Sequence, residues 1–128
     1  MEFSNEQKLI VTLLTDIHGA LKIKDSVDPE FVQRMVVSDN GWALSWRYPG
    51  FFESSEETPA RVLFVADVLD MWEMIERYYE ELDAKQREHL QQLAPIFGKA
   101  PIFRGFDGNN EAEERSIVRI FVLEIVRW

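Results

Sequence analysis

The chain has 128 residues, a length typical of one domain and sufficient to bury a hydrophobic core without disulfides. It contains no cysteine, which excludes a disulfide framework, a thiolate metal site and a thiol nucleophile. Its 23 acidic residues outnumber 14 Lys and Arg, and the net charge of −9 disfavours nucleic-acid binding through a broad basic surface. No apolar run approaches the roughly 20 residues of a membrane span, and the first residues lack a signal-peptide pattern. We therefore expect a single cytoplasmic domain over residues 1–128, without membrane or nucleic-acid partners.

The first predicted helix begins at Ser4, because Gln7 follows three residues later in the spacing of a capping box. An apolar stripe at helical spacing then runs through Ile10, Leu13, Leu14, Ile17 and Leu21. A second helix is predicted from Asp28-Pro29, a cap residue followed by a first-turn proline. We expect it to end at Asn40-Gly41, where Gly41 would take the left-handed conformation.

The segment 42–52 has an ambiguous pattern. Trp42, Leu44, Trp46 and Tyr48 alternate with smaller or polar residues, which is the periodicity of a strand. No second clear strand lies nearby, and an isolated strand or hairpin is marginal in water. The sequence therefore predicts an irregular or extended aromatic arm over 42–52 that packs against the helices.

The longest predicted helix covers residues 58–82. At about 100° per residue, its apolar side chains fill roughly half of the circumference, too wide an arc for one neighbour. Glu76 interrupts this arc, so a buried Glu76 needs a donor, with Arg61, Arg104 or Arg119 as candidates. The chain then continues with a short helix from Asp83 to Leu93, in which Leu90 and Leu93 point inward. A loop follows, and the last predicted helix is capped by Asn110 and Glu113. The fold class is all-α, with about five helices packed around the helix at 58–82 and the terminal helices flanking it.

Four stretches of the sequence form a recognisable set: Ser4 to Ile10, Glu56 to Thr58 with Asp67 to Trp72, Gly105 to Glu111, and Ile120 to Val122. Together they resemble the YfbU family, a group of largely helical bacterial proteins without an established biochemical activity. The region from Asp28-Pro29 to Trp42 also fits in register. The resemblance implies a helical fold and carries over no catalytic or ligand residues. Chains of this family are expected to continue with a further helical segment, which would make this sequence either C-terminally truncated or a short member of the family.

The loop at 105–111 is one candidate site. Glycines before a helix can present backbone N–H groups to an anion, which suggests a ligand or anion site at Gly105, Asp107, Gly108, Asn109 and Asn110. The simpler interpretation is structural, because acidic residues already surround this loop. In that interpretation the glycines supply unusual backbone angles, Asp107 and Asn110 cap the helix, and Phe103 and Phe106 anchor the loop.

Carboxylates and histidines give weaker signals. Asp67 and Asp70 with Glu73 form an acidic stripe that would usually be a solvated helix face. A small hydrolase or divalent-metal enzyme using Asp67, Asp70 and Asp107 is the alternative function. His18 and His89 lack a nearby ligand spacing, so the sequence predicts neither a metal site nor a cofactor.

The aromatic arm is the strongest indication of a partner in the sequence. Five aromatic residues within eleven positions are costly to leave in water, so we expect a partner interface, most simply with a second copy of the chain. Its residues are Trp42, Trp46, Tyr48, Phe51 and Phe52. The predicted function is a non-enzymatic interaction or regulatory domain that self-associates, and a further protein partner is a second expectation.

Overall fold

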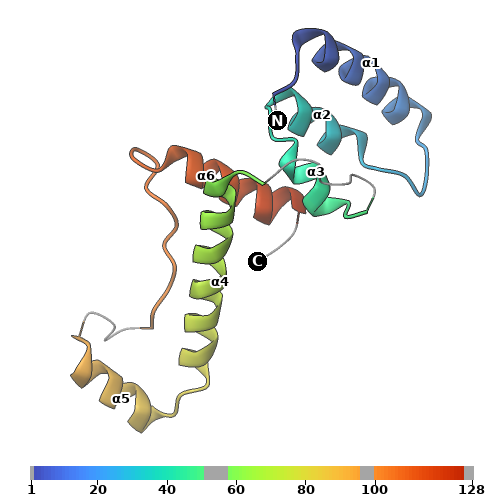
Figure 1. The fold of residues 1–128 in the computed structure, drawn as a ribbon. Coiled ribbons are helices and arrows are strands. Elements are labelled where there is room, and N and C mark those ends of the chain that lie inside the picture. Colours follow the sequence, from blue (N-terminus) through green and yellow to red (C-terminus); the bar gives the residue numbers. More distant parts are fainter. Residues whose placement is uncertain (1, 51–57, 96–99, 126–128) are drawn as a thin grey trace. The chain divides into compact units, whose positions relative to one another are not determined.

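The computed structural model describes residues 2–50, 58–95 and 100–125. These residues are all-α and contain no strand, as predicted (Figure 1). They form six α-helices, where about five were predicted, followed by one π-helix. In chain order the helices are α1 (Asn5–Leu21), α2 (Pro29–Val37), α3 (Trp42–Arg47), α4 (Ala60–Glu80), α5 (Ala84–Leu93), α6 (Ala112–Arg119) and the π-helix η2 (Ile120–Ile125).

The described residues form two compact units. The first unit holds the residues up to Pro59 together with Leu123–Ile125, and the second holds Ala60–Val122. In the first unit α1 packs against α2, and α2 packs against α3. In the second unit α4 packs against α6. The prediction that terminal helices flank the helix at 58–82 is therefore confirmed for α6, whereas α1 finds its packing partner in α2. That residues 1–128 form a single domain stays a prediction.

The helix starts follow local sequence rules. Ser4 and Gln7 form the predicted capping box at α1, and Asp28 caps α2 with Pro29 in its first turn. Asp83 forms a second capping box with Gln86 at α5. Each of these caps needs only residues within one turn, which is why the sequence indicates them correctly.

The predicted arm at 42–52 is wrong over its first half, because Trp42–Arg47 forms the helix α3. Alternation of large and small residues indicated an extended chain, but a short helix buries Trp42, Ala43 and Leu44 together against the rest of the first unit. Tertiary burial thus outweighs the local strand pattern. Phe51 and Phe52 lie outside the described residues.

The core of the first unit comes from α2 and α3. Its members are Phe31, Met35, Val36, Trp42, Ala43 and Leu44. Phe31 is fully buried, and its ring makes an edge contact with Tyr48 at 6.0 Å between centroids. The guanidinium of Arg47 lies 4.4 Å from the centroid of the Phe31 ring, a cation–π contact. The last turn of η2 joins this unit through Glu124, whose carboxylate accepts two hydrogen bonds from Arg34, at 3.0 and 2.7 Å. These bonds raise the pKa of Arg34 and hold the pair in a fixed geometry.

The end of α2 differs from the prediction at Gly41. The residue with a left-handed backbone is Asp39, at φ 59°, and Gly41 lies in the right-handed region at φ −56°. Aspartate tolerates the left-handed conformation better than most residues. Its side chain also reaches back to α1: Oδ1 accepts the Phe3 N–H at 3.0 Å and Oδ2 accepts a bond from Lys8 Nζ at 2.9 Å. Asp39 therefore connects the start of α1 to the end of α2.

We expect the Asp39→Asn variant to lose stability at neutral pH but not in acid. The hydrogen bond from the Phe3 N–H and, after it, the one from Lys8 lower the pKa of Asp39 in the folded protein. The stabilising contribution of Asp39 is therefore fully present above the pKa of the unfolded chain, about 3.9. It is lost as the pH falls through the lower pKa of the folded protein. Asparagine keeps the backbone preference and an acceptor for Phe3, but not the charge. Thermal unfolding of both proteins from neutral pH into acid measures the difference. A gap that stays constant across this pH range would contradict the assignment.

The second unit buries one face of α4. The buried residues are Val62, Val65, Ala66 and Leu69 on α4 with Ile117, Ile120 and Phe121 in the α6–η2 segment. The apolar arc predicted for residues 58–82 included Phe64, Met71 and Tyr78 and left out Val62 and Ala66. It is wrong at its edges, because the first three side chains are exposed and the last two are buried. Ion pairs also link α4 to α6, since Arg61 pairs with both Glu113 and Glu114.

Glu76 has a partner, but not one of the predicted arginines. Its Oε1 accepts the backbone N–H of Phe103 at 2.8 Å. The ring of Phe103 stacks on Trp72, which lies one turn before Glu76 on α4, at 5.7 Å between ring centroids. Phe106 makes an edge contact with Phe103 at 5.5 Å. The loop before α6 is thus anchored along α4, as the structural interpretation of Phe103 and Phe106 predicted.

Candidate functional site

The loop at 105–111 is organised by Asp107. Its Oδ1 accepts the N–H of Asn109 at 2.9 Å, and its Oδ2 accepts a bond from the side-chain amide of Asn110 at 2.8 Å. The N–H of Asp107 in turn donates to Glu111 Oε2 at 2.8 Å. The predicted capping box of Asn110 and Glu113 is wrong, because α6 begins after Glu111 without a side-chain cap. These contacts form a self-contained turn with carboxylates in it, which favours a structural role over an anion site.

Two glycines of this loop have different requirements. Gly105 has φ 87°, a conformation that L side chains rarely adopt. The nearest neighbours of a Cβ on Gly108 would instead be side-chain atoms of Arg115, first its guanidinium, which is the movable end of a long side chain. We expect Gly105→Ala to lower the free energy of unfolding by about 1–2 kcal/mol. Gly108→Ala should cost clearly less, because Arg115 can move away. Urea denaturation of the two variants compares them, and equal losses would contradict this account.

The carboxylates of the alternative enzyme function do not form a site in the described residues. Asp67 and Asp70 are exposed on α4, and both oxygens of Asp107 are used within its own turn. No group of three or more metal-ligating side chains occurs in the part of the chain that the structure describes. His18 Nε2 lies 3.0 Å from Ser26 Oγ, next to the turn after α1, which fits a structural role. Nothing within residues 2–50, 58–95 and 100–125 therefore favours carboxylate or metal chemistry.

The aromatic residues predicted as a partner interface have contacts inside the first unit. Trp42 is buried, and its ring meets Trp46 edge-on at 6.4 Å between centroids. Trp46 Nε1 donates to Thr58 Oγ1, and Tyr48 Oη accepts the Asp28 N–H at 2.9 Å. Packing within the unit accounts for these three side chains, and a partner interface on 42–52 stays a prediction.

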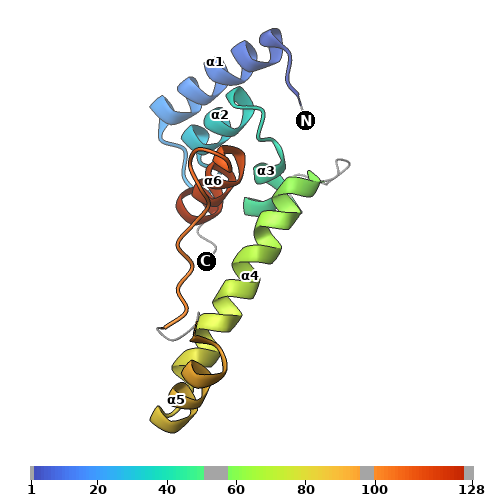
Figure 2. The ribbon, with the colours of Figure 1, turned by 90° about the vertical axis from the view of Figure 1, so that its left-hand side faces the viewer.

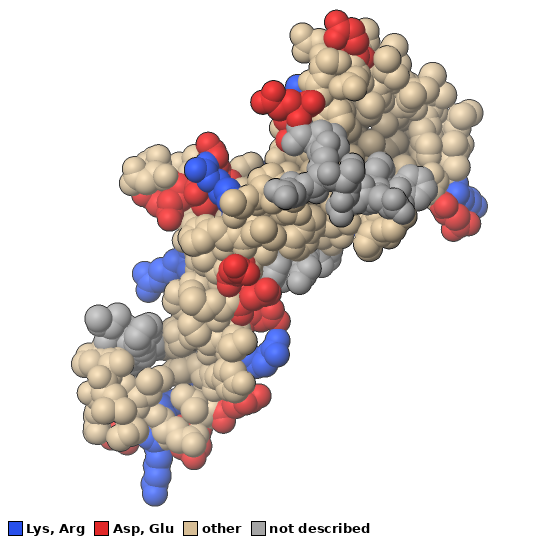
Figure 3. Space-filling view, in the orientation of Figure 1, with Lys and Arg blue, Asp and Glu red and all other residues tan. Residues whose placement is uncertain are grey.

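The apolar stripe of the first helix, α1, is exposed. We call the α1 stripe the six side chains that share one face and are each 55% to 67% exposed: Leu9, Ile10, Leu13, Leu14, Ile17 and Leu21. No residue of α1 is buried. In Figure 3 the surface over α1 shows few charged side chains between the two ends of the helix. A continuous exposed apolar face of this kind is typical of an interaction surface.

The opposite side of α1 holds it on α2 through polar contacts. Gln33 Nε2 donates to Thr15 Oγ1 and to Asp16 Oδ1, both at 2.9 Å. Lys8 Nζ forms its ion pair with Asp39 at 2.9 Å. Figures 1 and 2 both show α1 alongside α2. An ordinary amphipathic helix buries its apolar face and exposes its polar face; here the arrangement is reversed.

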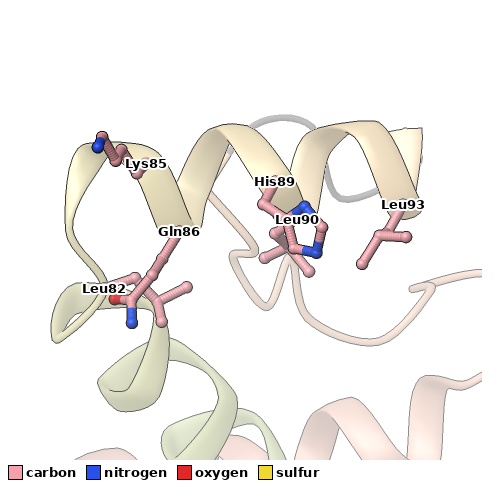
Figure 4. A pocket seen from close by; sticks show the side chains of 6 residues that line it. All are labelled: Leu82, Lys85, Gln86, His89, Leu90 and Leu93. Carbon is pink, nitrogen blue, oxygen red and sulfur yellow. The ribbon is translucent and has the colours of Figure 1, made fainter.

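A second apolar surface is an open hollow along α5. Its volume is about 460 Å³, and it is lined by Leu82, Lys85, Gln86, His89, Leu90 and Leu93 (Figure 4). The prediction that Leu90 and Leu93 point inward is wrong for Leu93, which is 71% exposed. Three leucines with one histidine, one lysine and one glutamine offer few convergent polar groups, so this hollow lacks the chemistry of a catalytic site.

Sequence reasoning identified the α1 stripe but not its exposure. Periodicity shows that apolar residues share a face, and the expected consequence was burial. The signal that could have indicated otherwise is polar: Thr12 and Thr15 lie on the other face of α1, and Gln33 of α2 donates hydrogen bonds to both.

The structure thus defines an all-α protein that presents an apolar helix face. No helix among the described residues has the length and apolarity needed to cross a membrane. The chain belongs to the YfbU family, since the model of the YfbU domain matches residues 1–128. Comparison with curated proteins found no match, and comparison with solved structures found none.

Proposed function

We propose that this protein is a non-enzymatic interaction domain that associates with a second copy of itself through the α1 stripe. The observation that carries this proposal is the reversed orientation of α1, with apolar side chains outward and polar side chains toward α2. We also propose a cytoplasmic location, which the absence of cysteine fits.

The exposed apolar area supplies the driving force. Full burial of one Leu or Ile side chain contributes about 1.5–3 kcal/mol, and each member of the α1 stripe still has more than half of its surface in water. Six neighbouring side chains therefore offer several kcal/mol to any partner that covers them. A second copy covers both stripes at once, in a symmetric interface.

The polar contacts on the other side favour a preformed surface. Rotating α1 to bury its stripe against α2 would break the bonds of Gln33 and the ion pair of Lys8 with Asp39. A helix fixed in this way loses less conformational freedom when a partner binds. The α1 stripe is therefore supported as a rigid interaction surface.

The mass of the wild-type protein in solution tests this function. We expect sedimentation velocity to show a monomer–dimer equilibrium between low micromolar and several hundred micromolar protein. A wild type that stays monomeric over this whole range would overturn self-association. Trp46→Ala serves as the comparison for the aromatic segment, because a dimer that depends on that segment would dissociate in this variant.

A further inference from the structure

The two ends of the α1 stripe carry opposite charges. Glu6 lies in the first turn, in line with the stripe at about 100° per residue, and it is exposed. Lys22 and Lys24 follow the last turn and are exposed as well. Of the other acidic and basic side chains of α1, Lys8 bonds to Asp39, Asp16 accepts a hydrogen bond from Gln33, and His18 contacts Ser26. Asp25 follows these lysines and is exposed too, so two lysines and one carboxylate lie beyond the last turn and leave a net positive charge there, whereas the first turn is negative.

We propose that two copies of the chain pair their α1 helices antiparallel, with Leu13 and Leu14 at the two-fold axis. This proposal rests on the function proposed above and adds its geometry. Ile10 then lies opposite Ile17 of the second copy, and Glu6 lies close to Lys22 of the second copy. The same contacts occur twice, because a two-fold interface is self-complementary.

The parallel arrangement has the opposite electrostatics. It would place Glu6 beside Glu6 and Lys22 beside Lys22, which repel, and it would align the two helix dipoles in the same direction. In the antiparallel pair both terms are favourable. The apolar stripe fixes which faces meet, whereas the end charges decide the direction.

Single cysteines distinguish the two directions, because the natural chain contains none. We expect Ile10→Cys and Ile17→Cys, mixed and oxidised, to form a mixed disulfide dimer, while each variant alone forms little. In the antiparallel pair two copies of position 10 are separated by about 10 Å along the axis, too far for a disulfide. Efficient disulfides within each single variant would overturn the antiparallel arrangement and leave self-association intact. A wild-type dimer that yields neither product would overturn the α1 stripe as the interface.

Charge exchange provides a second readout that does not depend on cysteine reactivity. We expect Glu6→Lys to weaken the dimer roughly three- to ten-fold at low salt, since two symmetry-related pairs are lost. Adding Lys22→Glu in the same chain should restore the affinity. A double variant no tighter than the single variant would contradict the pairing of these ends, and a monomeric wild type would instead overturn the proposed function itself.

Discussion

Replacing Leu13 and Ile17 by glutamate is expected to yield a monomer at every concentration at which the wild type forms a dimer. Both side chains lie near the middle of the α1 stripe and are 55% and 57% exposed. In the proposed dimer four carboxylates would meet at an apolar interface, where the cost of burying unpaired charges exceeds the gain from the remaining contacts. Sedimentation velocity gives the association state, and circular dichroism gives the stability.

The stability of the monomer should change little in this variant, because neither side chain contributes to the core of the first unit. A matched control is Met71→Glu with Met74→Glu on α4, which are 48% and 57% exposed. This control introduces the same charges at equally exposed apolar positions, and we expect it to leave the dimer intact. If the α4 variant dissociates and the α1 variant does not, the interface lies on α4.

Phe31→Ala is expected to lower the free energy of unfolding by about 3–5 kcal/mol, the usual range for a buried phenylalanine. The side chain is fully buried on α2, and its loss removes the ring contacts with Tyr48 and Arg47. The first unit contains few large buried residues, so little neighbouring bulk can fill the resulting cavity. Urea denaturation followed by tryptophan fluorescence reports the change, since Trp42 and Trp46 lie in the same unit.

The matched control for this substitution is Val37→Ala on the same helix. Val37 is 47% exposed, so its truncation should change stability by about 0.5 kcal/mol or less. A loss of less than about 1 kcal/mol for Phe31→Ala would mean that the α2–α3 core is not the stabilising centre of the first unit.

The positions at which most helices begin could be predicted because they depend on neighbours within one turn. Ser4 with Gln7, Asp28 with Pro29 and Asp83 with Gln86 each satisfy backbone N–H groups locally. The family resemblance was confirmed, since the model of the YfbU domain matches residues 1–128. Gly41 shows the limit of such rules, because the left-handed residue is Asp39, whose side chain is held by α1.

The candidate site required information from distant parts of the chain. The aromatic alternation at Trp42 to Tyr48 indicated an extended segment, but burial against α2 selects a helix. Glu76 needed a donor, and the donor is a backbone N–H group from a loop 27 residues later. Neither the packing of residues 42–47 on α2 nor the donor to Glu76 could be deduced from sequence spacing, because local patterns do not specify which distant segments come into contact.

The stripe of α1 illustrates both sides of this division. The sequence by itself determined that the segment is a helix with one apolar face, because capping and periodicity act over a few residues. Only the tertiary structure decided which face is covered. Hydrogen bonds from Gln33 and the ion pair of Lys8 with Asp39 turn the polar face toward α2, and the apolar face is therefore exposed.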